Sequence, residues 1–207
     1  MTPAVKICGV CSVEDAKLCI AAGADSIGLN FVPESPRRVD SATARAIVKT
    51  LNSMGSRALV VAVVANQSEH AIRALLNETG AACVQFHGDE SPEALAPFLP
   101  HAYKAIRIRN AADVASADAF PGEYILVDAY SPDALGGTGK TFSWDLVVPL
   151  AARRKLSLAG GLTPENVKEA VRIVQPFCVD VASGVESAPR KKDAAKVRAF
   201  VANAKRG

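Results

Sequence analysis

The chain alternates eight times between a short apolar run and a segment with helical spacing, and this alternation limits the fold more than any other feature. Most of the apolar runs are continuous rather than alternating with polar residues, which is typical of parallel strands covered on both faces. The runs are AVKICG, SIGLNFV, RALVVAVV, ACVQFHG, AYKAIRI, EYILVDAY, KLSLAGG and CVDVASG. Eight strand–helix units in about 200 residues match the small end of the (β/α)8 barrel.

The segments between the runs carry start and stop signals for helices. Side chains that can cap a helix precede four of them, at Ser12, Ser41, Ser91 and Thr163, and proline follows the last two. Gly23 and Gly80 stand where the first and third helices are expected to end. These signals support alternating strands and helices over the whole chain.

A doubly wound open sheet is the alternative architecture. It usually needs fewer strands, and the glycine-rich dinucleotide fingerprint after the first strand is missing. No linker rich in proline, glycine or serine divides the sequence. We therefore predict an α/β fold in which residues 1–207 form a single-domain (β/α)8 TIM barrel.

The composition narrows the class of partner. The net charge is only +3, and basic residues cluster near residues 190–192 and the C-terminal end, so nucleic acid is not expected as a partner. No apolar stretch approaches the ~20 residues that span a bilayer, and the N-terminal residues lack a secretory pattern. An odd set of five cysteines in such a chain predicts reduced thiols in the cytoplasm.

In a (β/α)8 barrel the chemistry sits at the C-terminal ends of the strands, and two reactive groups end strands here. Asp128 closes the sixth run beside apolar residues, and burial there would raise its pKa and favour proton donation. Cys8 closes the first run, with Lys6 on the same side of the strand to favour a thiolate. The alternatives are a loop-capping aspartate and a small buried hydrophobic cysteine.

Glycine-containing turns follow the seventh and eighth runs, where this fold often binds phosphate. Gly160 and Gly161 precede one predicted helix start, and Ser183 and Gly184 follow the last strand. Glycine lets backbone N–H groups approach an anion closely. The alternative is that these glycines only make tight turns.

The sequence does not decide the roles of three other motifs. The pair Arg37 and Arg38 suits a carboxylate or phosphate, or forms a solvated loop. GGTGKT at 136–141 lacks the P-loop spacing and reads as an active-site cover or a plain connector. Cys8 and Cys11 form a C-x-x-C pair, but a zinc site needs two further ligands that the sequence does not offer at suitable spacing.

Taken in order, several stretches resemble the phosphoribosylanthranilate isomerase family of tryptophan biosynthesis. They are VKICGV, GADSIGLNFVPESPRRV, VQFHGDE, ILVDAYSPDALGGTGKTFSWDL, LAGGLTPENV and VDVASGVESAPRKKD, and together they span residues 5–193. A mild departure is Pro189-Arg190, where proline-glycine is usual in the family.

The resemblance implies a (β/α)8 barrel without cofactor or metal that catalyses an Amadori rearrangement of a phosphorylated aminosugar. It implies that Cys8 is the general base, Asp128 the general acid and Arg37 the residue that holds the anthranilate carboxylate, with Arg38 beside it. Asp180 is expected to bind a sugar hydroxyl, and His87 to line the site. The expected assembly is a monomer or homodimer.

Three rival functions stay open at this point. The related isomerase of histidine biosynthesis uses two aspartates, one of them where Cys8 stands. Indole-glycerol-phosphate synthase needs a lysine acid that no strand end here supplies. A redox or metal-binding protein would use Cys8 and Cys11 instead.

Overall fold

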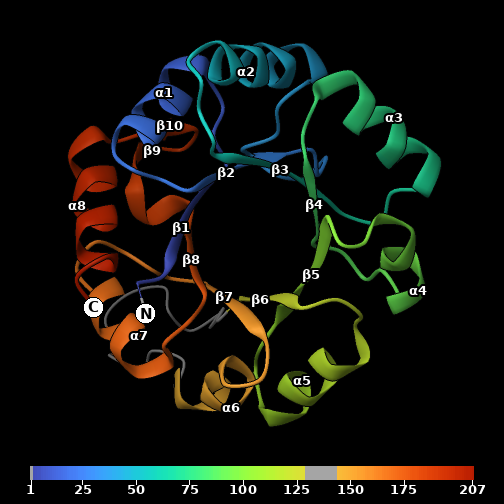
Figure 1. Ribbon diagram of the computed structural model, residues 1–207, viewed down its shortest axis with the longest axis vertical. Helices are drawn as coiled ribbons and strands as arrows, with labels where there is room; N and C mark the ends of the chain where they lie inside the picture. The colour runs from blue at the N-terminus through green and yellow to red at the C-terminus, as the bar shows by residue number, and fades with distance from the viewer. Residues whose placement is uncertain (1, 129–143) are drawn as a thin grey trace.

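The computed structural model describes residues 2–128 and 144–207. Eight parallel strands close into a barrel in chain order, because β8 also pairs with β1. Figure 1 shows the ring of strands with the helices outside it. The strands are β1 (Ala4–Cys8), β2 (Ser26–Asn30), β3 (Leu59–Val64), β4 (Cys83–Phe86), β5 (Ala102–Arg107), β6 (Tyr124–Asp128), β7 (Lys155–Ala159) and β8 (Cys178–Val181). The predicted (β/α)8 barrel is confirmed.

Helices follow the strands and cover the outside of the barrel (Figure 1). The α-helices are α1 (Val13–Ala21), α2 (Ser41–Ser53), α3 (Glu69–Thr79), α4 (Pro92–Leu95), α5 (Ala111–Ser116), α6 (Val148–Ala151), α7 (Val167–Val174) and α8 (Ala194–Ala204). Short 3-10 helices are η1 (Ala96–Phe98), η2 (Ala117–Ala119), η4 (Trp144–Val147) and η5 (Ser183–Val185). In the described parts of the chain, no helix is long and apolar enough to cross a bilayer.

An additional hairpin stands between β8 and α8. Its strands, β9 (Glu186–Ala188) and β10 (Lys191–Lys192), pair antiparallel and lie outside the barrel beside α1 (Figure 1). The sequence analysis did not predict this hairpin.

The predicted helix boundaries are partly correct. Ser12 caps α1 by accepting a hydrogen bond from the Asp15 backbone N–H, as expected. Two predicted starts are wrong. Asp40 rather than Ser41 caps α2, because its carboxylate accepts from the Thr43 N–H at 2.7 Å. The segment after Thr163 first makes a turn, so α7 begins only at Val167.

The expected helix ends at two glycines are confirmed. Gly80 caps α3 with a left-handed φ of 76°, a conformation that glycine adopts without strain. Gly23 directly follows the C-cap of α1 and has φ 93°.

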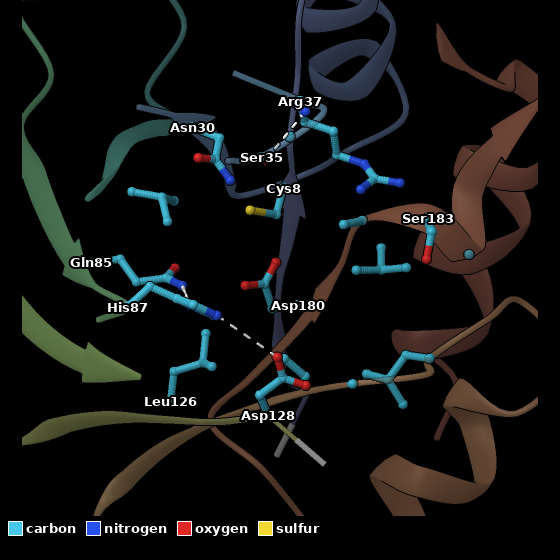
Figure 2. Close-up of a pocket in the computed structure, with 18 of the residues that line it drawn as sticks. Cys8, Asn30, Ser35, Arg37, Gln85, His87, Leu126, Asp128, Asp180 and Ser183 are labelled. Carbon is cyan, nitrogen blue, oxygen red and sulfur yellow. Dashed lines mark hydrogen bonds and ion pairs between the residues drawn. The ribbon is translucent and has the colours of Figure 1, made fainter. Parts of the chain in front are cut away.

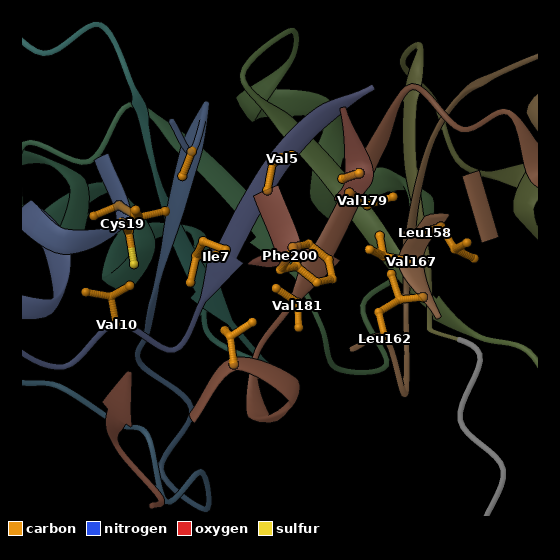
Figure 3. Close-up of a cluster of buried hydrophobic side chains, with 14 of the residues drawn as sticks. Val5, Ile7, Val10, Cys19, Leu158, Leu162, Val167, Val179, Val181 and Phe200 are labelled. Atoms are coloured by element: carbon orange, nitrogen blue, oxygen red, sulfur yellow. The ribbon is translucent and has the colours of Figure 1, made fainter. Parts of the chain in front are cut away.

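Strand residues alternate between the two sides of the barrel wall. Outward-facing side chains such as Val5 and Ile7 are fully buried in a cluster that includes Phe200 of α8 (Figure 3). A smaller cluster within the barrel includes Val61 and Leu126. Lys6 and Cys8 have the parity opposite to Val5 and Ile7, which brings them to the inner side.

Candidate active site

A cavity of about 390 Å³ opens at the C-terminal ends of the barrel strands. Figure 2 shows the Cys8 thiol and the Asp128 carboxyl entering it from different strands, with Asp180 between them. All nine residues predicted for the site line this cavity: Cys8, Arg37, His87, Asp128, Gly160, Gly161, Asp180, Ser183 and Gly184. Its volume suits a small molecule rather than a macromolecular segment.

A buried ion pair lies beneath the cavity floor. The Lys6 Nζ donates to Asp180 Oδ2 at 2.8 Å, and the two side chains are only 2% and 3% exposed. Burial lowers the pKa of Lys6, but the charges of Asp180 and Cys8 outweigh it, so the pKa stands well above its usual value. Lys6 is therefore a fixed positive charge below the Cys8 thiol.

The second oxygen of Asp180, Oδ1, is buried and has no hydrogen-bond partner among the described residues. A buried carboxylate oxygen without a partner is costly unless something else donates to it. Since Asp180 lines the cavity, this oxygen can accept a hydrogen bond from a ligand hydroxyl.

The two predicted acid–base groups have raised pKa values. Burial raises the pKa of the Cys8 thiol, and Lys6 opposes this rise without cancelling it. Burial also raises the pKa of Asp128, with a further rise from the charge of Asp180. Arg107, the register partner of Asp128 on β5, lowers it in part. Asp128 is thus suited to retain a proton, as expected from the sequence.

His87 faces Asp128 across part of the cavity. Its Nδ1 lies 3.0 Å from Gln85 Nε2, and Gln85 Oε1 accepts from the Tyr103 hydroxyl at 3.1 Å. This arrangement makes Nδ1 an acceptor and leaves the proton on Nε2, 3.9 Å from Asp128 Oδ2. Burial, with help from Arg107, lowers the pKa of His87, so a neutral N–H donor points into the site.

Arg37 and not Arg38 lines the cavity, although the sequence left the choice between them open. One edge of the Arg37 guanidinium binds Glu186 of β9, through Nε at 2.8 Å and Nη2 at 2.6 Å. Arg38 is exposed. Gly9 makes room for the arginine, because a Cβ there would collide with Arg37 Cδ.

The glycines of the two turns have different structural reasons. Gly161 has φ 64°, and a Cβ there would meet no atom within 4 Å, so only its backbone conformation favours glycine. Gly184 is needed for packing, because a Cβ there would collide with the carbonyl oxygen of Leu162. The turns after β7 and β8 therefore pack directly against each other at one side of the cavity.

Sequence reasoning missed several residues that shape the site. Gln85 lies two positions before His87 on the inward face of β4, so strand parity could have indicated it. Glu186 binds Arg37 across 149 residues, and no local pattern indicates such a partner. The motif at 136–141 lies outside the described residues.

The alternative role of Cys8 and Cys11 gains no support from the geometry. Both thiols are free, and Cys11 is not a cavity residue; its Sγ donates to the carbonyls of Gly9 and Arg37. Among the described residues, no three His, Cys, Asp or Glu side chains form a group that could hold a metal ion.

Comparison with known proteins identifies the family. The model of the family described as N-(5'-phosphoribosyl)anthranilate (PRA) isomerase matches residues 5–203. The chain belongs to this family. The N-(5'-phosphoribosyl)anthranilate isomerase of Neisseria meningitidis serogroup A is 46% identical over 203 residues, 97% of this chain and 96% of that protein. The relative of the same name from Pelobacter propionicus is 41% identical and covers 97% of this chain and 95% of its own length.

Solved structures of phosphoribosyl anthranilate isomerases agree with this assignment. The crystal structure of the enzyme from Thermotoga maritima superposes with a TM-score of 0.89 at 38% identity, over 99% of this chain and 100% of that one. Another, in complex with reduced 1-(o-carboxyphenylamino)-1-deoxyribulose 5-phosphate, gives 0.86 at 35% identity, over 99% and 100%. The family, the fold and the isomerase class expected from the sequence are therefore confirmed.

Proposed function

We propose that this chain converts N-(5'-phosphoribosyl)anthranilate to 1-(2-carboxyphenylamino)-1-deoxyribulose 5-phosphate, with Asp128 as general acid and Cys8 as general base. The observation that carries the proposal is that a thiol and a carboxyl with a raised pKa line one cavity beside two glycine turns. Membership of the family makes this the favoured reaction among sugar-phosphate isomerisations.

The first step opens the ribose ring. Asp128 gives its proton to the ring oxygen as the C1–O bond breaks, and the anilino nitrogen supplies the electron pair that forms the C=N bond. Burial raises the pKa of the acid and so favours the protonated form that the donation requires. The neutral His87 N–H, 3.9 Å from the carboxyl, is positioned to stabilise the carboxylate that remains.

The second step removes the proton from C2. The iminium formed in the first step acidifies this C–H bond, and the Cys8 thiolate takes the proton while the electrons form the enolamine. Lys6, fixed below the sulfur, stabilises the thiolate. Tautomerisation then moves a proton from the C2 hydroxyl to C1 and gives the ketone.

The remaining cavity residues hold the two ends of the substrate in this proposal. The backbone around Gly160, Gly161, Ser183 and Gly184 would bind the phosphate, and the free oxygen of Asp180 a sugar hydroxyl. The unused edge of Arg37 would bind the anthranilate carboxylate. Fixed ends orient the ring between acid and base.

The test is the loss of anthranilate-type fluorescence when phosphoribosylanthranilate is mixed with the protein. Cys8→Ala and Asp128→Asn should each lower kcat by at least ~10²-fold while the circular dichroism spectrum is unchanged. Cys11→Ser is the matched control and should retain activity, since serine keeps a donor for the two carbonyls. Full activity in Cys8→Ala, or equal losses in the Cys8 and Cys11 variants, would refute the assignment.

We further propose that the chain acts as one domain in the cytoplasm, without a cofactor, as a monomer or homodimer. The five cysteines are all free, which suits a reducing compartment. A solved relative from Thermotoga maritima is described as a dimeric enzyme from which monomers were generated. Light scattering on purified protein would decide the assembly, and the fluorescence assay with and without chelator would decide any need for metal.

A further inference from the structure

The β9–β10 hairpin holds Arg37 from two directions. Glu186, at the start of β9, binds the guanidinium through both carboxylate oxygens. Glu186 is itself fixed, because its side chain is only 5% exposed and Oε1 also accepts from Lys192 Nζ at 3.1 Å. The guanidinium of Arg37 is therefore bound to a buried carboxylate whose position is fixed.

The backbone of Arg37 is held by a second residue of the same hairpin. Nη1 of Arg190 donates to the carbonyl oxygen of Pro36 at 2.9 Å and to that of Arg38 at 2.8 Å. These are the two carbonyls that flank Arg37 in the chain. Arg190 thus clasps the β2–α2 loop at the position from which Arg37 enters the cavity.

Arg190 makes these contacts from a costly backbone conformation. Its φ is 73°, in the left-handed region that glycine adopts without strain and other residues rarely occupy. A strained residue persists only where the surrounding structure compensates for it. The two hydrogen bonds to the loop of Arg37 are the compensation visible here.

We propose that Arg190 and Glu186 are positioning residues that hold the Arg37 guanidinium ready for the carboxylate end of the substrate. This inference rests on the proposed function, because it concerns the same ligand. Figure 2 shows Arg37 beside Cys8, on the side of the thiol away from Asp128. The clasp fixes the position of Arg37 before the ligand arrives.

The charges and donors around Arg37 fit this role. A guanidinium has five N–H donors, and Glu186 takes one from Nε and one from Nη2. No side chain or backbone group among the described residues takes the Nη1 donors, which a planar carboxylate can therefore use. Lys192 supplies a second positive charge to Glu186, so the three groups keep one net positive charge toward an anionic ligand.

The first test is Arg190→Gly, which removes the clasp and relieves the positive φ, so the variant should fold. When an arginine becomes ordered only on binding, the affinity for the ligand is about 2- to 12-fold lower than when the arginine is already held in place. We expect KM for phosphoribosylanthranilate to rise by that factor, with kcat within ~2-fold of the parent because acid and base are untouched.

The matched control is Gln175→Gly. Gln175 also has a positive φ, 50°, and is exposed at the C-cap of α7, before β8 begins and away from the cavity. The substitution makes the same change in backbone freedom without touching the loop of Arg37. Its KM should equal that of the parent.

A binding measurement separates this inference from the proposed function. By calorimetry, Arg190→Gly and Glu186→Gln should weaken binding of reduced 1-(o-carboxyphenylamino)-1-deoxyribulose 5-phosphate, but not of the same compound lacking the carboxylate. In an Arg37→Ala background neither substitution should have a further effect. Equal weakening of both compounds, or an undiminished effect without Arg37, would overturn the inference. A parent protein that binds both compounds but does not turn over the substrate would instead refute the proposed function.

Discussion

Replacing Lys6 by methionine should destabilise the protein strongly, although methionine is apolar and close in length. Lys6 Nζ is the one hydrogen-bond donor to Asp180 within the described residues, at 2.8 Å, and both side chains are at most 3% exposed. Asp180 Oδ1 already has no partner. Lys6→Met therefore leaves a buried carboxylate with neither charge nor hydrogen-bond compensation.

The expected loss of stability follows from the free energy needed to bury an unpaired charge. Removing one member of a buried pair typically costs about 3–5 kcal/mol, because the other charge stays uncompensated. For a chain of this length that corresponds to a fall in Tm of about 6–20 °C. The double variant Lys6→Met, Asp180→Asn removes both charges and should cost less than Lys6→Met alone, since no charge is left buried.

Urea unfolding followed by circular dichroism measures these free energies at neutral pH. The parent, the two single variants and the double variant complete a double-mutant cycle. Arg73→Met is a matched control, because Arg73 pairs with Glu69 on the exposed face of α3 and should cost at most about 1 kcal/mol. The reasoning would be refuted if the free energy of unfolding of Lys6→Met lay within 1 kcal/mol of that of the parent. It would also be refuted if the double variant were less stable than Lys6→Met.

Two further predictions concern pH and the glycine-containing turns after β7 and β8. Arg107 lowers the pKa of Asp128, so Arg107→Gln should raise that pKa. Because the general acid must carry its proton, the alkaline limb of the kcat/KM profile, where Asp128 loses that proton, should move to higher pH; an unmoved limb would exclude Asp128 as the group it reports. Gly184→Ala should lower stability by about 1–3 kcal/mol and weaken inhibition by inorganic phosphate, because its Cβ would collide with the Leu162 carbonyl. Gly161→Ala, whose Cβ meets open space, should cost only about 1 kcal/mol of backbone strain, and equal costs in urea unfolding would contradict this distinction.

The fold and the location of the site could be predicted because both depend on short-range patterns. Cys8 and Asp128 were found as the last residues of apolar runs, and in a parallel barrel all such ends meet at one mouth. Lys6 was placed beside Cys8 by strand parity alone. These inferences need no knowledge of distant partners.

What could not be predicted depends on contacts between residues far apart in the chain. The partner of Lys6 is 174 positions away, and the partner of Arg37 is 149 positions away. Asp180 was expected in the site, but nothing in its local sequence indicates that it pairs with Lys6, and no local pattern indicates Glu186 at all. The start of α7 was misplaced for a different reason, since Thr163-Pro164 satisfies the local rule for a helix start while the chain first makes a turn.

The contacts of the Lys192 ammonium determine when, during synthesis, one part of the candidate site can be completed. It donates to the carbonyl of Cys8, 184 residues earlier, and to that of Ala182, so one late residue ties the first strand to the end of the last. On the ribosome, the strand that bears the thiol emerges 184 residues before the lysine. The nascent chain therefore cannot close this seam of the candidate site until the β9–β10 hairpin has left the exit tunnel.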